Sequence, residues 1–308
     1  MRVTQAGFYT QSTQQMSNQQ SKVFETQAQL ASGKKILRPS DDPALATALN
    51  NLKSQIDVNQ RYLTNLGRMQ DTLNMQETSI NSSVDVVARI KELSLQAAND
   101  TYNAQDRKSV AAEVKELIST LVDLGNLRGT DGAYLFSGFS QNQTPFTEDS
   151  SGAVTYNGTT DYQNVLVDEG RRMQIGIPGS DVYGSAQHLD QNTGMTSSIE
   201  IFATLGVMHQ ALIDNDADAI RDNLAKVSSV HNHIIIQQAN IGSRMQRIAT
   251  LTQVIEDRDF TYKALQSNME DLDYVEAASR LKNQSLALQA GQQTFAQISG
   301  LSLFQYIR

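Results

Sequence analysis

The sequence predicts a mainly α protein: an elongated up-and-down helical bundle or coiled coil formed by both chain ends, with a small β-rich insertion at the middle of the chain. Three observations predict this class. Apolar residues recur at seven-residue steps near both termini, and the same spacing continues through two very long internal segments. The pattern changes to strand-like alternation only near the middle of the 308 residues.

Both chain ends carry a narrow apolar stripe. Seven-residue spacing keeps one seam of a helix against one partner helix. The companion positions Thr13, Gln20 and Gln27 are polar, so an isolated helix of this kind is marginal in water. We therefore expect the ends to become ordered by docking on each other and on neighbouring copies. The predicted assembly seam consists of Tyr9, Met16, Val23 and Leu30 near the start and Tyr274, Leu281, Leu288 and Phe295 near the end.

The boundaries of the first two helices are readable from their capping residues. The first helix is expected to run to about Ala31, with Gly33 in the left-handed conformation that ends many helices. Asp42 followed by Pro43 is a strong start signal, because Pro43 lacks an N–H that the first helical turn would leave unpaired. The apolar spacing predicts that the helix beginning there continues to residue 98.

The middle of the chain changes character. A break over residues 99–103 precedes a third helix that glycines close from Gly125 onward. Alternating and turn-forming residues follow, including Asn157–Gly158, a two-residue hairpin signal. Residues 140–190 therefore read as a small β-rich insertion, and the simplest packing places it at the far tip of the bundle.

The last third of the chain returns to helix. The return is predicted near Ser197, and either Asp216 or Asp218 can cap a further very long helix. The predicted domains are residues 1–42 pairing with 271–308, a rod of long helices over 43–139 and 191–270, and the insertion over 140–190.

Composition excludes several classes of function. The net charge of −8 without a basic cluster disfavours nucleic-acid and anionic-membrane partners. The chain has no cysteine, and no apolar run approaches the ~18 residues of a membrane span. The N-terminus lacks the apolar segment of a cleaved secretory signal. This leaves open cytoplasmic residence or export by a dedicated apparatus.

The pattern of polar residues predicts no catalytic, cofactor-binding or metal site. His231 and His233 are two residues apart on a helix, so they point to different sides. The run Asp214–Asp218 imitates a calcium loop, but Ala219 replaces the turn glycine and Ala225 the bidentate glutamate. Helix capping is the better interpretation of these aspartates, and we expect no enzyme activity.

Two motifs stand out, the run Arg38–Pro43 near the start and Ile241–Gly242 near the end. They resemble motifs of the bacterial flagellin superfamily. The N-terminal signature is similar to the form found in hook–filament junction proteins, whereas flagellins usually carry Ala-Lys-Asp-Asp-Ala there. A second motif resembles the flagellin-type Ile-Gly-Ala sequence, and the resemblance covers essentially the whole chain in order. One departure is Gly291, which weakens the last helix by roughly 1 kcal/mol relative to alanine. The matching residues are Arg38, Pro39, Ser40, Asp41, Asp42, Pro43, Ile241 and Gly242.

The resemblance implies a structural subunit that joins the flagellar hook to the filament. Such a subunit is exported unfolded by the flagellar type III pathway and templates flagellin assembly outside the cell, without a cleaved signal peptide. By analogy, the terminal helices line an inner tube, the long helices form its wall and the insertion projects from the surface.

The partners implied by the resemblance are further copies of the chain in a ring or short helical layer, the proximal hook-associated junction protein, flagellin, and an export chaperone on the C-terminal region. No nucleic acid and no membrane span are expected. The alternatives are a flagellin filament subunit and a secreted coiled-coil protein without a flagellar role.

Overall fold

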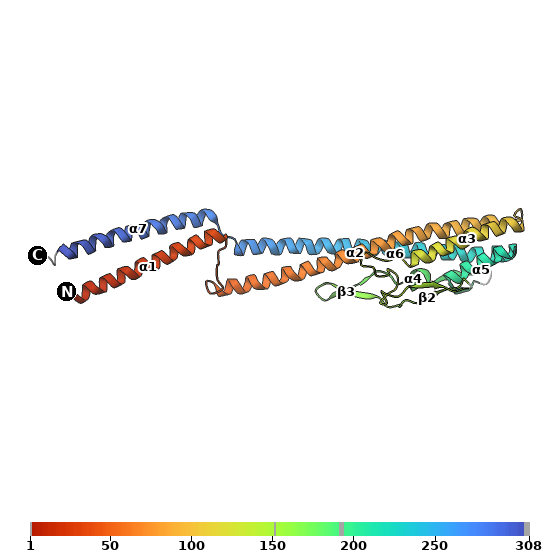
Figure 1. The fold of residues 1–308 in the computed structure, drawn as a ribbon, viewed down its shortest axis with the longest axis horizontal. Helices are drawn as coiled ribbons and strands as arrows, with labels where there is room; N and C mark the ends of the chain where they lie inside the picture. Colours follow the sequence, from red (N-terminus) through yellow and green to blue (C-terminus); the bar gives the residue numbers. More distant parts are fainter. Residues whose placement is uncertain (1, 151, 191–193, 305–308) are drawn as a thin grey trace. The chain divides into compact units, whose positions relative to one another are not determined.

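In the computed structural model, helices precede and follow a small strand-containing region in the middle of the chain (Figure 1). The structure describes residues 2–150, 152–190 and 194–304. Within these residues there are seven helices and six short strands. The predicted class, mainly α with a small β-containing middle, is confirmed. The contacts divide the chain into two compact units, a first unit of residues 1–58 with 257–308 and a second unit of residues 59–256.

The secondary-structure elements follow the predicted order. The helices are α1 (Arg2–Ser32), α2 (Pro43–Ala97), α3 (Ala104–Gly125), α4 (Gly179–Tyr183), α5 (Ile201–Ile213), α6 (Ala217–Glu270) and α7 (Tyr274–Phe304). The strands are β1 (Phe146–Glu148), β2 (Val154–Tyr156), β3 (Gln163–Asp168), β4 (Arg171–Ile175), β5 (Ser185–Leu189) and β6 (Thr196–Glu200). The strands form three separate antiparallel pairs, β1–β2, β3–β4 and β5–β6.

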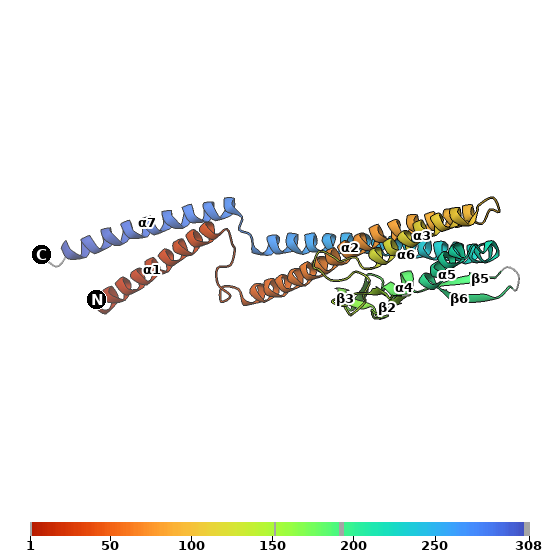
Figure 2. The same ribbon diagram turned by 45° about the vertical axis from the view of Figure 1, so that its right-hand side comes forward.

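In the first unit, α1 and α7 lie side by side and run in opposite directions in both views (Figures 1 and 2). Gly33 has φ +71° and its N–H donates to Gln29 O at 2.8 Å, which ends α1 as expected. The Asp42 carboxylate accepts the Leu45 N–H at 2.9 Å, so the predicted N-cap of α2 is confirmed.

In the second unit, α2, α3, α5 and α6 pack together around a continuous apolar core. The seven-residue stripes of the two long helices supply much of it. On α2 the stripe is fully buried at Leu66, Leu73, Ile80 and Val87, and on α6 at Ile220, Val227, Ile234, Ile241 and, almost completely, Ile248. Burial of each such side chain stabilises the fold by about 1.5–3 kcal/mol, so this part of the predicted rod has a core of its own.

The strand-containing region lies along the helices of the second unit rather than at their tip (Figures 1 and 2). The fully buried Gln76 side chain of α2 donates to Ile177 O at 2.9 Å and accepts from Ile177 N–H at 2.9 Å. Closer to the N-terminus of α2, the Asn65 side-chain amide donates to Leu166 O at 2.9 Å. The predicted tip position is therefore wrong, whereas the expected projection of the region from the surface of an assembly stays a prediction. The polar groups of α2 that hold the region in place are not recognisable from spacing.

An aromatic cluster fixes the same region to the helices. The Phe146 ring lies 5.5 Å from the rings of both Tyr183 and Phe202, and the Tyr183 hydroxyl is 2.8 Å from Ser83 Oγ on α2. Offset and edge-to-face ring pairs of this kind each add about 0.5–1.5 kcal/mol beyond burial. The middle region and the bundle therefore share one core.

The predicted return to helix near Ser197 is wrong by about four residues. Ser197 lies in β6, where Ile199 pairs with Ala186 of β5, and α5 begins at Ile201. Ile199 and Phe202 are three apart, a spacing typical of helix, but a single strand residue before a helix gives the same spacing. The strand region thus extends to residue 200, into the part of the chain that we assigned to the helical rod.

The hairpin predicted at Asn157–Gly158 is also wrong. β2 ends just before it, and the Asn157 N–H donates to Pro145 O at 2.7 Å, which extends the β1–β2 pair. A Cβ at Gly158 would lie 2.4 Å from the Tyr156 hydroxyl, which donates to Phe136 O at 2.9 Å. The glycine therefore permits close approach of a tyrosine ring and does not form a two-residue turn.

Candidate assembly surfaces

The structure brings the two ends of the predicted seam together in the α1–α7 pair. The rings of Tyr9 and Phe295 form an edge-to-face contact, with centroids 5.6 Å apart and planes at 87°. A Cβ at Gly291 would lie 4.0 Å from Met16 Cγ, so these two residues face each other. Val23 is the best-covered member of the seam, with 8% of its surface exposed. The first and last stripes therefore form one interface.

This interface is thin. Leu30, Leu281 and Leu288 are only half-buried, and Tyr274 remains 57% exposed with its hydroxyl against Gly33. Large apolar side chains on both helices also face outward, namely Phe24, Val275 and Leu286. The pair thus leaves several large apolar side chains uncovered. The role of the eight seam residues in assembly stays a prediction.

Polar contacts at the centre of the pair were not predicted. The Thr26 hydroxyl donates to Gln284 Oε1 at 2.9 Å, and the Gln19 amide donates to Gln284 O at 3.2 Å. Glutamines are frequent throughout both helices, so their spacing carries no signal that singles out these three side chains.

The segments next to the pair are tied together by backbone hydrogen bonds. The Leu272 N–H donates to Gly33 O at 2.9 Å and the Lys35 N–H donates to Glu270 O at 2.8 Å. A Cβ at Gly33 would lie 2.7 Å from the Tyr274 hydroxyl. Both the positive φ and this close approach therefore require glycine at position 33.

A small charge cluster reinforces this connection. Glu270 accepts ion pairs from Lys34 at 2.7 Å and Lys53 at 3.2 Å. The hydrogen bond from Lys34, followed by that from Gln266, lowers the pKa of the Glu270 carboxyl to about 2. Local sequence patterns carry no sign of the cluster, because Glu270 is more than 200 residues from both lysines.

The family-signature residues Arg38–Pro43 form an exposed, ordered turn. The Asp41 carboxylate accepts the Arg38 N–H at 2.8 Å, while Asp42 caps α2. The side chains of Arg38, Pro39 and Ser40 are exposed, and the Arg38 guanidinium has no polar partner among the residues that the structure describes. The aspartates therefore shape the turn, and the first three residues are available for contact with another molecule.

The second signature motif is only half explained by the fold. Ile241 is fully buried in the core of the second unit. Gly242, the next residue in α6, has no atom within 4 Å of an added Cβ. The isoleucine is thus needed for packing, whereas nothing in the described structure requires the glycine.

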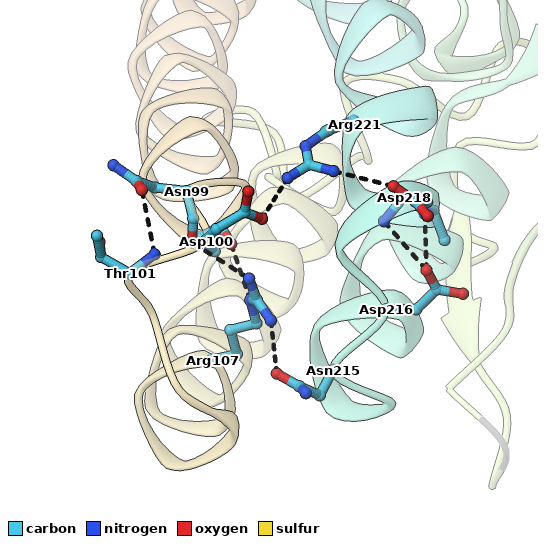
Figure 3. Close-up of polar contacts among 10 residues, drawn as sticks. Asn99, Asp100, Thr101, Arg107, Asn215, Asp216, Asp218 and Arg221 are labelled. Atoms are coloured by element: carbon cyan, nitrogen blue, oxygen red, sulfur yellow. Dashed lines mark hydrogen bonds and ion pairs between the residues drawn. The ribbon is translucent and has the colours of Figure 1, made fainter.

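A polar cluster joins the two turns at one end of the bundle (Figure 3). The buried Arg107 donates to Ala97 O at 2.9 Å and to Asn215 Oδ1 at 2.7 Å, so it connects the α2–α3 turn with the α5–α6 turn. Arg221 of α6 forms an ion pair with Asp100 of the α2–α3 turn. These contacts hold the two turns together, so the role of the cluster is structural.

The aspartates of the calcium-loop-like run act as helix caps. Asp216 Oδ1 accepts the N–H groups of Asp218 and Ala219 at 3.1 and 3.0 Å. Of the two caps that the sequence allowed, the structure selects Asp216. Two histidines also have structural partners: His188 Nδ1 lies 2.9 Å from Ser229 Oγ, and His233 Nε2 lies 2.8 Å from Asp181 O.

A pair of terminal helices, a helical bundle and a small inserted β region in one chain define a class of protein, and two family models identify it. The bacterial flagellin N-terminal helical region matches residues 4–141, and the bacterial flagellin C-terminal helical region matches residues 224–307. The chain therefore belongs to the bacterial flagellin superfamily.

Within that superfamily the chain is a hook–filament junction protein. It is 26% identical to flagellar hook-associated protein 3 of Salmonella typhimurium over 320 residues, which cover 100% of both chains. It is 25% identical to flagellar hook-associated protein 3 of Escherichia coli, over 99% of both. These relatives are structural proteins of the flagellum, which lies outside the cell.

Solved structures show the same fold. Flagellar hook-associated protein-3 of Legionella pneumophila matches with a TM-score of 0.63 and 17% identity, over 71% of this chain and 98% of that one. FlgL of Xanthomonas campestris matches with a TM-score of 0.62 and 18% identity, over 70% and 99%. No helix in the described part of this chain is both long and apolar enough to cross a membrane.

Proposed function

We propose that the chain is exported unfolded by the flagellar type III pathway, without a cleaved signal peptide, and forms the layer between hook and filament on which flagellin assembles. Its work is structural, and it catalyses no reaction. The observation that carries the proposal is the α1–α7 pair. Seam residues from both termini meet there, yet Phe24, Val275 and Leu286 stay exposed. A pair built in this way gains most of its burial from neighbouring subunits.

The proposed partners follow from the same surfaces. Further copies of the chain cover the sides of the pair in a ring or short helical layer, with the proximal hook-associated junction protein on one side and flagellin on the other. Before assembly, the exposed apolar residues of α7 need a cover, which an export chaperone on the C-terminal region supplies.

We assign the regions of the chain distinct places in this layer. Residues 1–42 with 271–308 line the inner tube, and the long helices over 43–139 and 191–270 form the wall. The inserted region, proposed from the sequence as 140–190, is extended to residue 200 because β6 ends there.

A flagellin filament subunit is the second candidate. The chain is 23% identical to flagellin FlaB1 of Treponema pallidum over 87% of its own length and 82% of that protein. A deletion strain separates the two roles. Loss of a junction subunit leaves hooks intact, releases flagellin into the medium and abolishes filaments. Intact filaments in that strain would contradict the junction role.

A single substitution tests the seam. Leu288→Asp places a charge in the α1–α7 interface, which is costly unless the charge is paired. We expect incorporation into flagella to fall by about tenfold or more, corresponding to at least ~1.4 kcal/mol of lost contact, while thermal unfolding of the second unit is unchanged. Gln289→Asp, at the adjacent exposed position, is the matched control. Equal incorporation of both variants would argue against the seam.

A further inference from the structure

The second unit contains a pocket, formed by the β3–β4 pair and α6, that three arginines line. Its volume is about 330 Å³, at the lower end of the range for clefts that hold small molecules. Arg172 of β4 and Arg244 and Arg247 of α6 supply the guanidiniums. Asn164 and Gln174 add two side-chain amides, and no carboxylate of the described residues lines the pocket. The wall of the pocket therefore carries three positive charges and no negative one.

Neutral groups hold one of the three guanidiniums in place. Arg244 is half-buried, its Nη1 donates to Gly176 O at 3.0 Å, and its guanidinium lies 5.5 Å from the centre of the Tyr162 ring. The Asp181 carboxylate accepts the Tyr162 hydroxyl and is not part of the pocket wall. A guanidinium has five N–H donors, so the bond to Gly176 O leaves donors for a further acceptor. These contacts therefore position Arg244 without supplying a counter-charge inside the pocket.

The other two guanidiniums have no polar partner. Arg172 and Arg247 are exposed and form no hydrogen bond or ion pair with residues in the described part of the chain. Arg172 lies opposite Leu166 of β3, which is apolar. Positions three and four residues away share one side of a helix. For Arg247 these positions hold Ser243, Arg244, Thr250 and Leu251. The helix turns around Arg247 and the strand position opposite Arg172 thus offer no carboxylate.

This lack of counter-charge contrasts with other arginines of the second unit. Arg89 forms ion pairs with two glutamates, and Arg221 forms ion pairs with two aspartates. The chain also has carboxylates in excess, 33 against 25 basic side chains. Guanidiniums that line one small pocket repel each other, and salt screens this repulsion fully only beyond the Debye length of about 8 Å. An anion from solution would remove the repulsion that the chain itself leaves uncompensated.

We propose that this pocket binds a multiply charged oxyanion of the phosphate or sulfate class, which bridges β4 to α6. Guanidiniums form charge-assisted, often bidentate hydrogen bonds to such oxygens, and the amides of Asn164 and Gln174 are further donors. The anion joins Arg172 on β4 to Arg244 and Arg247 on α6, so its binding stabilises the packing of the strand region on the bundle. The inference does not depend on the proposed function, because a single copy of the chain forms the whole site.

Thermal unfolding of the dilute full-length chain in inorganic phosphate tests the site. Phosphate is added near neutral pH while sodium chloride keeps the ionic strength constant, and circular dichroism follows the unfolding. We expect the Tm of the second unit to rise by about 3–6 °C when phosphate exceeds its Kd about tenfold. Isothermal titration calorimetry should give one phosphate per chain. Neither a rise in Tm nor any heat of binding would overturn the inference only if both measurements gave a signal, so the absence of both contradicts it.

Two adjacent arginines of β4 provide a matched pair of variants. Arg172 lines the pocket, whereas Arg171 is equally exposed and does not line it. Arg172→Gln and Arg247→Gln should each weaken phosphate binding about tenfold or more, and Arg171→Gln should change it by less than about twofold. Phosphate also stabilises proteins by exclusion from their surface, and the Arg171→Gln control carries that general effect at the same net charge. Equal Tm increases in the Arg171→Gln and Arg172→Gln variants would overturn the inference.

The stability of the same variants without phosphate gives an independent measurement. Neither Arg172 nor Arg247 makes a polar contact that the fold uses, so both variants should fold. In low salt we expect Arg247→Gln to raise the Tm by about 1–3 °C, because one of three like charges is removed. Arg171→Gln should leave the Tm unchanged. A lower Tm for Arg247→Gln in the absence of phosphate would show that the guanidinium has a partner within the chain, and would contradict the proposed anion site.

Discussion

The terminal helix pair and the four-helix bundle use the same seven-residue spacing with opposite results. In the bundle, the stripe residues of α6 from Ile220 to Ile248 are at most 1% exposed. In the pair, the best-covered stripe residue, Val23, is 8% exposed and most others are only half-buried. Spacing indicates which side of a helix meets a partner, and it does not indicate how many partners there are.

The number of neighbours explains the difference. Each long helix of the bundle has other helices and the inserted β region around its apolar stripe. In the pair, α1 and α7 cover each other on one side only. At ~25 cal/mol per Å² of buried apolar area against ~1–2 kcal/mol of entropy per ordered residue, a single contact line leaves a helix near the limit of stability. This is why we propose that neighbouring subunits complete the burial of the pair.

Hydrogen exchange of the dilute monomer measures the largest difference between the two regions. Core amides of α2 and α6, such as those near Ile80 and Ile234, are expected to open with free energies close to global unfolding, about 5–15 kcal/mol. Amides of α1 and α7 are expected to open for about 1–2 kcal/mol or less. Strong protection of the α1 and α7 amides against exchange in the monomer would show that the terminal pair is as stable as the bundle.

Truncating one phenylalanine in each region gives the next largest contrast. Phe146→Ala removes a ring that contacts Tyr183 and Phe202 in the bundle, and we expect it to lower the free energy of unfolding by about 3–5 kcal/mol. Phe24→Ala, at an outward position of α1, should change it by less than about 0.5 kcal/mol. Urea unfolding followed by circular dichroism measures both. Similar losses would mean that α1 is as well packed as the bundle.

The same contrast marks the limit of what could be predicted from the sequence. Features set by neighbours in the chain were predicted correctly, such as Asp42 and Pro43 at the start of α2. The position of the β region was predicted wrongly, because it depends on Gln76 contacting Ile177, 101 residues away. The Glu270 cluster was missed for the same reason. A polar side chain that binds a distant backbone group has no periodic signal.

Acid should loosen the segments beside the pair before it affects the bundle. The folded-state pKa of Glu270 is about 2, below the ordinary value of 4.5. Its ion pairs with Lys34 and Lys53 therefore stabilise the fold fully above about pH 4.5, and this contribution is lost as the pH falls from 4.5 towards 2. Both lysines are about half-exposed, so solvent screening limits the loss to about 1 kcal/mol.

Exchange of the Lys35 amide, which donates to Glu270 O, reports this loss locally. Glu270→Gln should abolish the pH dependence of the protection of the Lys35 amide between pH 4.5 and 2. The protection of amides near Ile234 should be unaffected. An unchanged pH dependence in the Glu270→Gln variant would assign the acid response to other carboxylates.

The smallest expected effect tests whether the helix propensity of α7 limits the stability of the terminal pair. Gly291→Ala removes a helix-weakening residue from α7, which is worth up to about 1 kcal/mol. The new methyl group would lie 4.0 Å from Met16 Cγ, an ordinary contact distance, so it adds packing without a clash. We expect slower exchange of α7 amides in the monomer. Gly242→Ala in α6 is the matched control, since its Cβ would have no atom within 4 Å, and it should leave the exchange of α7 unchanged. If Gly291→Ala has no effect on α7 either, the missing contact with neighbouring subunits, rather than the glycine, sets the stability of the pair.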